Sequence, residues 1–375
     1  MEERFDTSLA DSQGTNVQAL SPKAFDLQAY CDYEAELLEG CNKFWNKSGG
    51  IAVYRRFRVP EVFSWACSDR KISLELQLGA LKKSMAYKAD IPNFLEPWYG
   101  IGVVASAFGI PYIWNDGQAP AVESSYKTAR EVLAAKKGSV AESPAGKHVL
   151  EMIEYFLDKT KGMIPVSLSD TQSPLNIVSS YLMDSSSFMY EIYDHPEELK
   201  TLLLDVAEME AEFLRAQQAL IGDVLVKPGH GFASARCFAG VGFSDDNILM
   251  FSDEVYEDFA IPSLLKATEG FAGPVFHSCG DWSWRAELVK RIPGLLMADA
   301  AVGKMTDPSP NNLEMLAEAF SESEVILHTR IVGGPATIRK YIPHLRNSRL
   351  KTIVATYCQT PEEQEEVYTL IHQEH

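Results

Sequence analysis

The stretch PVFHSCGDWSWRAELVKRIPGLLMAD, residues 274–299, contains two short apolar runs separated by a segment with helical spacing. The runs PVFHSC and LLMAD are apolar throughout and do not alternate, which is typical of strands with both faces buried. Between them, WRAELVKRI has the three- and four-residue spacing of an amphipathic helix. This stretch therefore predicts a strand, a helix and a second strand of a parallel sheet.

The same order of elements continues to the end of the chain. Two more apolar runs, VILHT at 325–329 and TIVATYC at 352–358, are each followed by a helical segment, as LLMAD is by NNLEMLAEAF. The two final helical segments, PATIRKYIPHL and PEEQEEVYTLI, both begin with the proline that first helical positions favour. The last hundred residues therefore predict four β/α units.

Upstream, further strands are predicted within DIPNFLEPW, GMIPVSLSD, GDVLVK and ARCFAGVGF, although the last is equally consistent with a loop. Eight such units in 375 residues predict an α/β fold, a single (β/α)8 TIM barrel. Residues 20–90 are expected to form a helical N-terminal extension. We divide the chain into a flexible leader, 1–22, and a barrel domain, 23–375.

Composition excludes several classes of partner. The formal charge is 34 − 52 = −18, so a surface for nucleic acid is not expected. No apolar run approaches the roughly 18 residues of a membrane span, and the first residues are acidic where a signal peptide is basic. We therefore expect a cytoplasmic protein. Its six cysteines follow no short repeating spacing, which favours reduced thiols or metal ligands over a disulfide scaffold.

His277 and Cys279 are the first candidates for a site. Residues two apart on a strand point to the same side, so an imidazole and a thiolate can meet at the carboxyl end of PVFHSC. Active sites of barrel enzymes lie at that end, and Cys358 closes the last predicted strand there. Three such ligands with one open position are typical of catalytic zinc. The alternative is a hydrogen-bonded core histidine with two small buried thiols.

Several segments together carry a family resemblance. HSCG follows a segment with the pattern DD…S-x-E-x-[FY]…P, and a lone cysteine ends the last strand. With EPWYGIGVVASAFG, RIVGG, TYCQTPEEQEEV and the long segment 173–206, the chain from about residue 60 resembles the uroporphyrinogen decarboxylase superfamily. It is most similar to the zinc-dependent branch, the methylcobamide:coenzyme M methyltransferases and related corrinoid methyltransferases.

The resemblance implies a zinc ion bound through an H-x-C-xn-C motif, here His277, Cys279 and Cys358. It further implies methyl transfer between a corrinoid (cobalamin) carried by a partner protein and a small molecule, such as the thiol of coenzyme M. Coordination to zinc deprotonates a thiol and makes it a nucleophile at neutral pH. The direction of transfer stays open.

The resemblance also has departures. The R-Q-A-G-R-Y segment that holds substrate carboxylates in the decarboxylase is missing, and the nearest basic run is YRRFRVP, with Arg55, Arg56 and Arg58. Such a run is more often a solvated edge or a set of surface ion pairs. Where the family carries a glycine-bearing GN, this chain has HTRIVGG, with His328 and Arg330.

Other polar residues have a structural and a functional interpretation. The resemblance places Asp245 and Asp246 at the pocket rim as candidate catalytic groups, whereas the residues alone also suit turn and capping roles. Asp299 is a candidate for the substrate-binding side of the site, where it is a fourth ligand or orients His277. Candidate substrate-binding residues also have a plainer role, in packing or in a hydrogen bond to a neighbouring carbonyl; they are Trp98, Tyr99 and His328.

Two other functions remain open from the sequence. One is a lyase of the decarboxylase type, without metal, in which carboxylates and arginines do the chemistry. The other is a non-catalytic barrel whose zinc is structural, which requires four protein ligands. KPGHGF lacks the Walker pattern, so His230 is interpreted as a loop residue.

Overall fold

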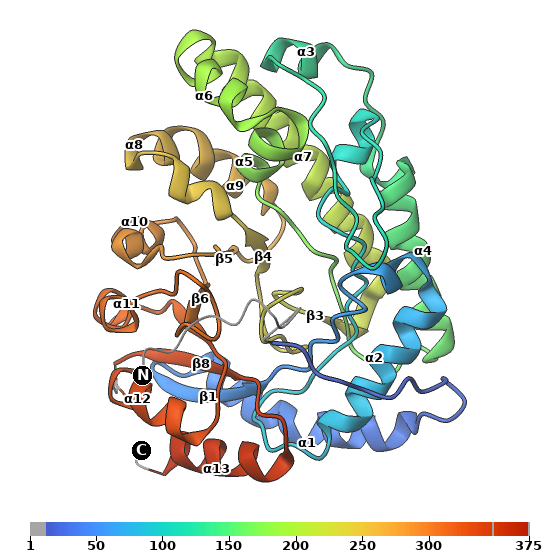
Figure 1. Cartoon of the computed structure of the whole chain (residues 1–375), viewed down its shortest axis with the longest axis vertical. Helices are drawn as coiled ribbons and strands as arrows, with labels where there is room; N and C mark the ends of the chain where they lie inside the picture. The colour runs from blue at the N-terminus through green and yellow to red at the C-terminus, as the bar shows by residue number, and fades with distance from the viewer. Residues whose placement is uncertain (1–12, 347–348, 374–375) are drawn as a thin grey trace.

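The computed structural model describes residues 13–346 and 349–373 and shows a ring of strands enclosed by helices (Figure 1). In these residues a six-stranded parallel sheet has the order β1-β8-β7-β6-β5-β4, and β2 and β3 form a second parallel pair. The strands are β1 (Gly50–Arg55), β2 (Val166–Ser167), β3 (Leu225–Val226), β4 (Val241–Ser244), β5 (Pro274–His277), β6 (Met297–Val302), β7 (Ile326–Ile331) and β8 (Lys351–Thr356).

Short backbone contacts join the two sheets into a ring. The Asp90 N–H donates to the Val53 carbonyl at 2.8 Å, and Leu95 forms a parallel bridge with Val166 of β2. On the other side of the β2–β3 pair, the Gly242 N–H of β4 donates to the Pro228 carbonyl at 3.1 Å. These contacts confirm the predicted α/β barrel of the TIM type.

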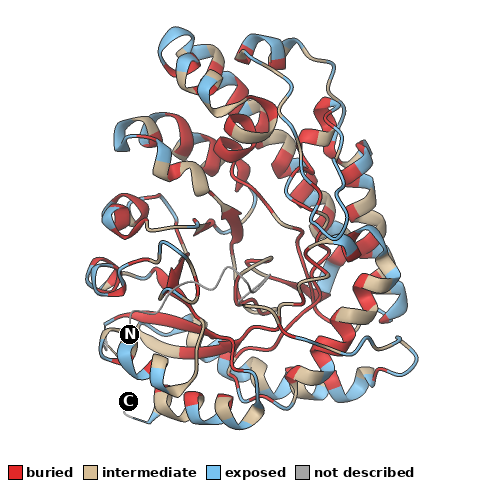
Figure 2. Cartoon of the chain, in the orientation of Figure 1, coloured by how far each residue is buried: buried red, intermediate tan, exposed pale blue. Residues whose placement is uncertain are grey.

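Helices cover the outside of the ring, and Figure 2 shows their buried sides turned toward it. The long helices begin as the sequence predicts, since Thr360, for example, caps the last one and a proline follows it. The helices are α1 (Leu27–Asn46), α2 (Arg70–Ser84), α3 (Ala129–Ala134), α4 (Pro144–Lys159), α5 (Pro174–Asn176), α6 (Ser185–Asp194), α7 (Pro196–Ile221), α8 (Asp253–Val255), α9 (Ile261–Ala267), α10 (Ala286–Lys290), α11 (Leu313–Phe320), α12 (Pro335–Leu345) and α13 (Pro361–His372).

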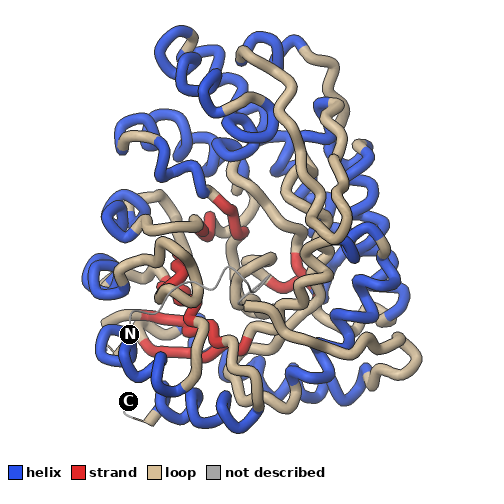
Figure 3. Tube along the Cα trace, viewed as in Figure 1, coloured by secondary structure: helices blue, strands red, loops and turns tan. Residues whose placement is uncertain are grey.

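The N-terminal half differs most from the prediction. β1 was expected to belong to a helical layer, but it is a barrel strand paired with β8 from Gly50↔Lys351 to Arg55↔Thr356. Among the described residues, 90–98 form a β-bridge at Leu95 and no longer strand, and the segment that follows contains a 3₁₀ turn, Ala105–Phe108. Figure 3 shows long loops in this part of the ring. Closely spaced glycines and a proline explain the loops, because both residue types weaken helices.

Alternate residues of the strands lie on opposite sides of the sheet. Val275, Met297 and Ile353 belong to an apolar cluster inside the ring, together with Ala355 and Tyr54. Their chain neighbours belong to the larger cluster under the outer helices, namely Phe276, Ala298 and Val354. This alternation decides which polar residues reach the interior of the barrel.

Residues 13–22 of the predicted leader lie against the barrel, while residues 1–12 are outside the described residues. The Thr15 N–H donates to the Arg58 carbonyl at 2.7 Å, and the Leu20 N–H donates to the Glu75 carbonyl at 2.8 Å. In the described part of the chain, every helix is too short or too polar to cross a membrane.

Candidate functional site

Strand register places a row of polar residues inside the barrel. Ser244 of β4 pairs with His277 of β5, and His277 pairs with Asp299 of β6. Asp299 in turn pairs with His328 of β7. Because all four have the inward orientation, their side chains share one level near the carboxyl ends of the strands. Barrel enzymes place their catalytic groups at that end.

Asp299 is the centre of this row. Its two carboxylate oxygens accept hydrogen bonds from His277 Nδ1 and His328 Nδ1, each at 2.5 Å, and from Arg330 Nε at 2.9 and 3.2 Å. Burial opposes its charged form, but Arg330 and the two histidines outweigh burial and hold the pKa of Asp299 well below its usual range. Asp299 is therefore an ionised, fully bonded carboxylate.

The two histidines differ in charge state because their surroundings differ. Burial lowers the pKa of His328, whose Nε2 accepts the Ala233 N–H at 3.3 Å, so His328 is neutral. Burial also acts to lower the pKa of His277, but hydrogen bonds with Asp299 and Cys279 raise it to about 10. Since both nitrogens of His328 are occupied, the predicted substrate-binding role has no support in its contacts.

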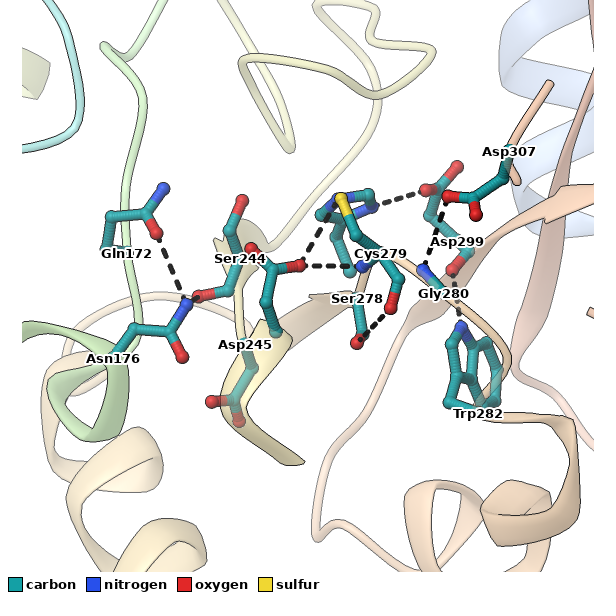
Figure 4. A network of polar contacts seen from close by, with 12 residues as sticks. Gln172, Asn176, Ser244, Asp245, Ser278, Cys279, Gly280, Trp282, Asp299 and Asp307 are labelled. Carbon is teal, nitrogen blue, oxygen red and sulfur yellow. Dashed lines mark hydrogen bonds and ion pairs between the residues drawn. The ribbon is translucent and has the colours of Figure 1, made fainter. Parts of the chain in front are cut away.

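Three side chains converge just above the row. Ligand atoms of Asp246, His277 and Cys279 all lie within 4.8 Å of one another. His277 Nε2 is 3.5 Å from Cys279 Sγ and 3.9 Å from Asp246 Oδ1. The Cys279 N–H donates to Asp246 Oδ1 at 2.6 Å, which fixes the carboxylate beside the thiol. Cys279 follows the end of β5, and Figure 4 shows it with Asp299 in this network of polar contacts.

This group fits a zinc ion by its chemistry. Imidazole nitrogen, thiolate sulfur and carboxylate oxygen are the three donor types that zinc takes from proteins. The His277 Nδ1 contact with Asp299 leaves Nε2 toward the other two donors, which is the carboxylate–histidine–metal arrangement of zinc proteins. Cys279 is exposed, so small molecules can reach this side of the group. Of the two roles considered for Asp299, the contacts therefore favour the one that orients His277.

Cys358 does not join this group, although it was predicted as a ligand. It lies two residues beyond β8, packs in the cluster under the outer helices with Val354, and is 2% exposed. Burial, above all, raises the pKa of its thiol to about 12. The prediction of Cys358 as a ligand considered only the end of the barrel at which β8 stops. Side chains along a strand alternate between the two faces of the sheet, and this alternation decides whether Cys358 projects inward or outward. Tyr357, one residue earlier, has the inward position.

Asp245 and Asp246 have different environments. Asp245 is buried, and its oxygens accept from the Ser173 hydroxyl at 2.6 Å and the Tyr256 hydroxyl at 2.5 Å. Burial raises the pKa of Asp245 to about 6. Its contacts are those of a structural carboxylate that ties β4 to two helices. Asp246, partly exposed, is the member of the pair that faces Cys279.

The two predicted aromatic residues, Trp98 and Tyr99, have different surroundings. Trp98 is buried and its Nε1 donates to Asp170 Oδ2 at 2.8 Å. Asp170 also lies 3.5 Å from His230 Nε2, and His230 Nδ1 lies 2.6 Å from Glu96. Tyr99 instead stacks on His148 at 3.8 Å between ring centroids, and packs with Tyr112 and Trp114. Only Trp98 joins a polar cluster.

The interpretation of the basic run from the sequence is wrong. The basic run at the end of β1 is no solvated edge, since Arg55 and Arg56 are 0% and 5% exposed. Arg55 Nε donates to the Cys358 carbonyl at 2.8 Å. His230 lies in a turn, as the sequence predicts, and there it contacts two carboxylates. Sequence reasoning did not single out Glu96, Arg55 or Arg56 as buried polar residues. The available signal was their position, since Glu96 ends NFLE and the two arginines end an apolar run.

Comparisons with known proteins agree with this architecture. Residues 51–227 match the family model described as uroporphyrinogen decarboxylase (URO-D). No curated protein sequence matches the chain. Among solved structures, a methyltransferase from Methanosarcina mazei has a similar fold, with a TM-score of 0.64 over 90% of this chain and 98% of that one, at 13% sequence identity.

The matched residues include β1, β2 and the 90–98 segment, and they end before β4. The similarity of fold extends over 90% of this chain. The chain is thus similar in sequence to the uroporphyrinogen decarboxylase family over residues 51–227, and similar in fold to a methyltransferase over most of its length.

Proposed function

We propose that this protein is a zinc-dependent methyltransferase, which moves a methyl group between a corrinoid carried by a partner protein and a thiol such as coenzyme M. The observation that carries the proposal is the convergence of Asp246, His277 and Cys279 at the carboxyl end of β5. The fold that the chain shares with a methyltransferase from Methanosarcina mazei supports the same reaction class.

The three donors would hold the zinc ion. When bound, the ion supplies deprotonation of a coordinated thiol and so provides a nucleophile at neutral pH. Within the described residues this group has three donors, the number that leaves a coordination position for an exchangeable ligand in catalytic zinc sites. A structural zinc site requires a fourth protein ligand, so the donor count favours the catalytic role.

The remaining residues of the site orient these donors. Asp299 fixes the tautomer and the ring direction of His277 through the 2.5 Å contact with Nδ1. Asp246 is held by the Cys279 N–H and lies beside the exposed thiol. A second hydrogen bond, from the Gly280 N–H to Asp307 at 3.3 Å, holds the loop after β5 (Figure 4). The site is therefore oriented before any ligand arrives.

Metal content and methyl transfer test the proposal together. The full chain, purified without added metal, should contain about one zinc ion and should methylate 2-mercaptoethanol from free methylcobalamin, a poor surrogate for the corrinoid protein. Cys279→Ser should abolish both, because a hydroxyl seldom ionises and binds zinc weakly. Cys237→Ser changes another free cysteine outside the group and is the matched control.

The two rival functions give different results in these experiments. Release of carbon dioxide from uroporphyrinogen at a rate above that of methyl transfer would establish the lyase instead. Zinc loss that lowers the melting temperature by many degrees, without any methyl transfer in the parent protein, would establish a structural zinc site.

A further inference from the structure

Two polar atoms inside the barrel have no hydrogen-bond partner among the described residues. They are Arg330 Nη2 and the Tyr357 hydroxyl oxygen. Arg330 is 8% exposed and Tyr357 is 2% exposed, so solvent does not replace the missing partners. A buried polar group without a partner costs about 1–3 kcal/mol, and native proteins keep few of them. Two neighbouring ones need an explanation.

Strand register brings these two groups to the same place. Arg330 of β7 pairs with Ala355 of β8, and Tyr357 lies two residues further along, on the same inward side. Such diagonal neighbours are within reach of long side chains. On the β1 side of β8, Arg55 pairs with Thr356. The next residues of the two strands, Arg56 and Tyr357, are therefore neighbours.

The orientation of Arg330 is fixed by Asp299. The Nε atom donates to both carboxylate oxygens, at 2.9 and 3.2 Å, while Nη2, on the same edge of the guanidinium, has no hydrogen-bond partner among the described residues. Asp299 also accepts from two histidines, so its capacity is used. Arg330 therefore presents a rigid, unoccupied donor.

The surroundings favour an anion as the missing partner. Arg56, Arg58 and Arg330 are close enough to interact electrostatically, and burial opposes the charged form of each. Glu96, a carboxylate that interacts with Arg56 and Arg58, is occupied by His230 and the Gly231 N–H. Guanidinium groups only donate hydrogen bonds, and a tyrosine hydroxyl readily does so, which suits an oxyanion better than a cation or a carbonyl dipole.

We propose that Arg330, Tyr357 and Arg56 form a subsite for one singly charged oxyanion group, of the carboxylate type, on a small substrate. The subsite lies beside the donor group of Asp246, His277 and Cys279, since Arg330 and His277 share Asp299 as a partner. The opposite end of the substrate therefore reaches Cys279. This last statement, on the reacting end, rests on the proposed function, whereas the subsite itself does not.

Binding of small probes to the full chain tests the subsite without any turnover. Calorimetry or ligand-observed NMR should detect propionate and 3-mercaptopropionate. Tyr357→Phe should weaken both roughly tenfold or more, because hydrogen bonds to charged groups contribute about that much. The melting temperature should change little, since among the described residues the hydroxyl loses only its interaction with Arg56. The affinity for 2-mercaptoethanol, which has no charge, should stay unchanged.

Matched variants control for nonspecific effects. Arg330→Gln should weaken propionate binding at least as much as Tyr357→Phe. Arg339→Gln, which alters a guanidinium paired with Glu366 on the surface, and Tyr190→Phe, which alters an exposed tyrosine, should leave propionate binding unchanged. Propanesulfonate should bind like propionate, and propyl phosphate more weakly because of its second charge.

The outcomes separate this inference from the proposed function. Propionate binding that is absent, or unaffected by Tyr357→Phe, overturns the subsite even if zinc and methyl transfer are found. Propionate binding that depends on Tyr357 and Arg330 supports the subsite even in a protein that binds neither zinc nor thiols. Tighter binding of propyl phosphate than of propionate would overturn the assignment to a singly charged group.

Discussion

Asp299 Oδ2 accepts from His277 Nδ1 and Asp299 Oδ1 accepts from His328 Nδ1, each at 2.5 Å, so one buried carboxylate orients two histidines. The strand register explains this relationship, because β6 lies between β5 and β7. Only His277 has its second nitrogen directed at other metal-binding donors. Asp299 therefore determines which way the metal-binding imidazole faces.

Asp299→Asn should weaken zinc binding by about 10- to 100-fold, the usual effect of losing the carboxylate behind a ligating histidine. It should also destabilise the fold by about 3–5 kcal/mol, because Arg330 loses its buried counter-charge. Competition with a chelating dye and urea unfolding measure the two effects. Asp116→Asn, an exposed aspartate, is the control, and unchanged zinc affinity in Asp299→Asn would contradict the orienting role.

The two candidate cysteine ligands can be distinguished by substitution to serine. Cys279→Ser should remove zinc, since Cys279 Sγ is in the group of donors, whereas Cys358→Ser should retain about one ion per chain. Metal analysis after dialysis checks both variants. Loss of zinc in Cys358→Ser, with retention in Cys237→Ser, would instead support the ligand set predicted from the sequence.

Glu210 of α7 provides a test of pH dependence. Burial, with Asp170 nearby, raises the pKa of Glu210 well above its usual value, and its Oε2 has no partner among the described residues. A carboxylate with a raised folded-state pKa contributes stability below about pH 4.3, its unfolded value, and this is lost as pH rises through the folded value. Glu210→Gln should therefore stabilise the protein at pH 7–8, by about 1–3 kcal/mol.

The gain should vanish near pH 4, where the parent side chain is already neutral, and thermal unfolding across the pH range checks it. Glu212→Gln changes an exposed glutamate of the same helix and should have no comparable effect. A gain that is independent of pH would show that burial of charge at Glu210 is not the cause.

Two helical glycines test whether residues 13–22 are attached to the barrel. A Cβ atom on Gly79 of α2 would overlap the Gln18 carbonyl, whereas one on Gly40 of α1 would meet nothing within 4 Å. Gly79→Ala should release the segment and lower the melting temperature. Gly40→Ala should raise stability by about 0.5–1 kcal/mol, because alanine favours helix. Limited proteolysis near residue 18 measures the release, and equal cleavage of the two variants would contradict the attachment.

The sequence by itself predicted the elements with local signals. The four C-terminal β/α units form as expected, since apolar runs and helix starts depend on neighbours in the chain. His277 and Cys279 were placed together for the same reason, because two residues on one strand share a side. The short strand β1 was missed, because its arginine, Arg55, is buried through contacts with residues distant in sequence.

Tertiary structure alone decided the partners across strands. Register set Asp299 between His277 and His328, and alternation along β8 put Tyr357 inside the barrel and Cys358 outside it. Neither relationship has a local signal, since a shift of one residue reverses the side on which every residue of a strand projects. The sequence could therefore predict which residue types form the site. Which of these residues contact one another depended on how the eight strands of the described residues pair.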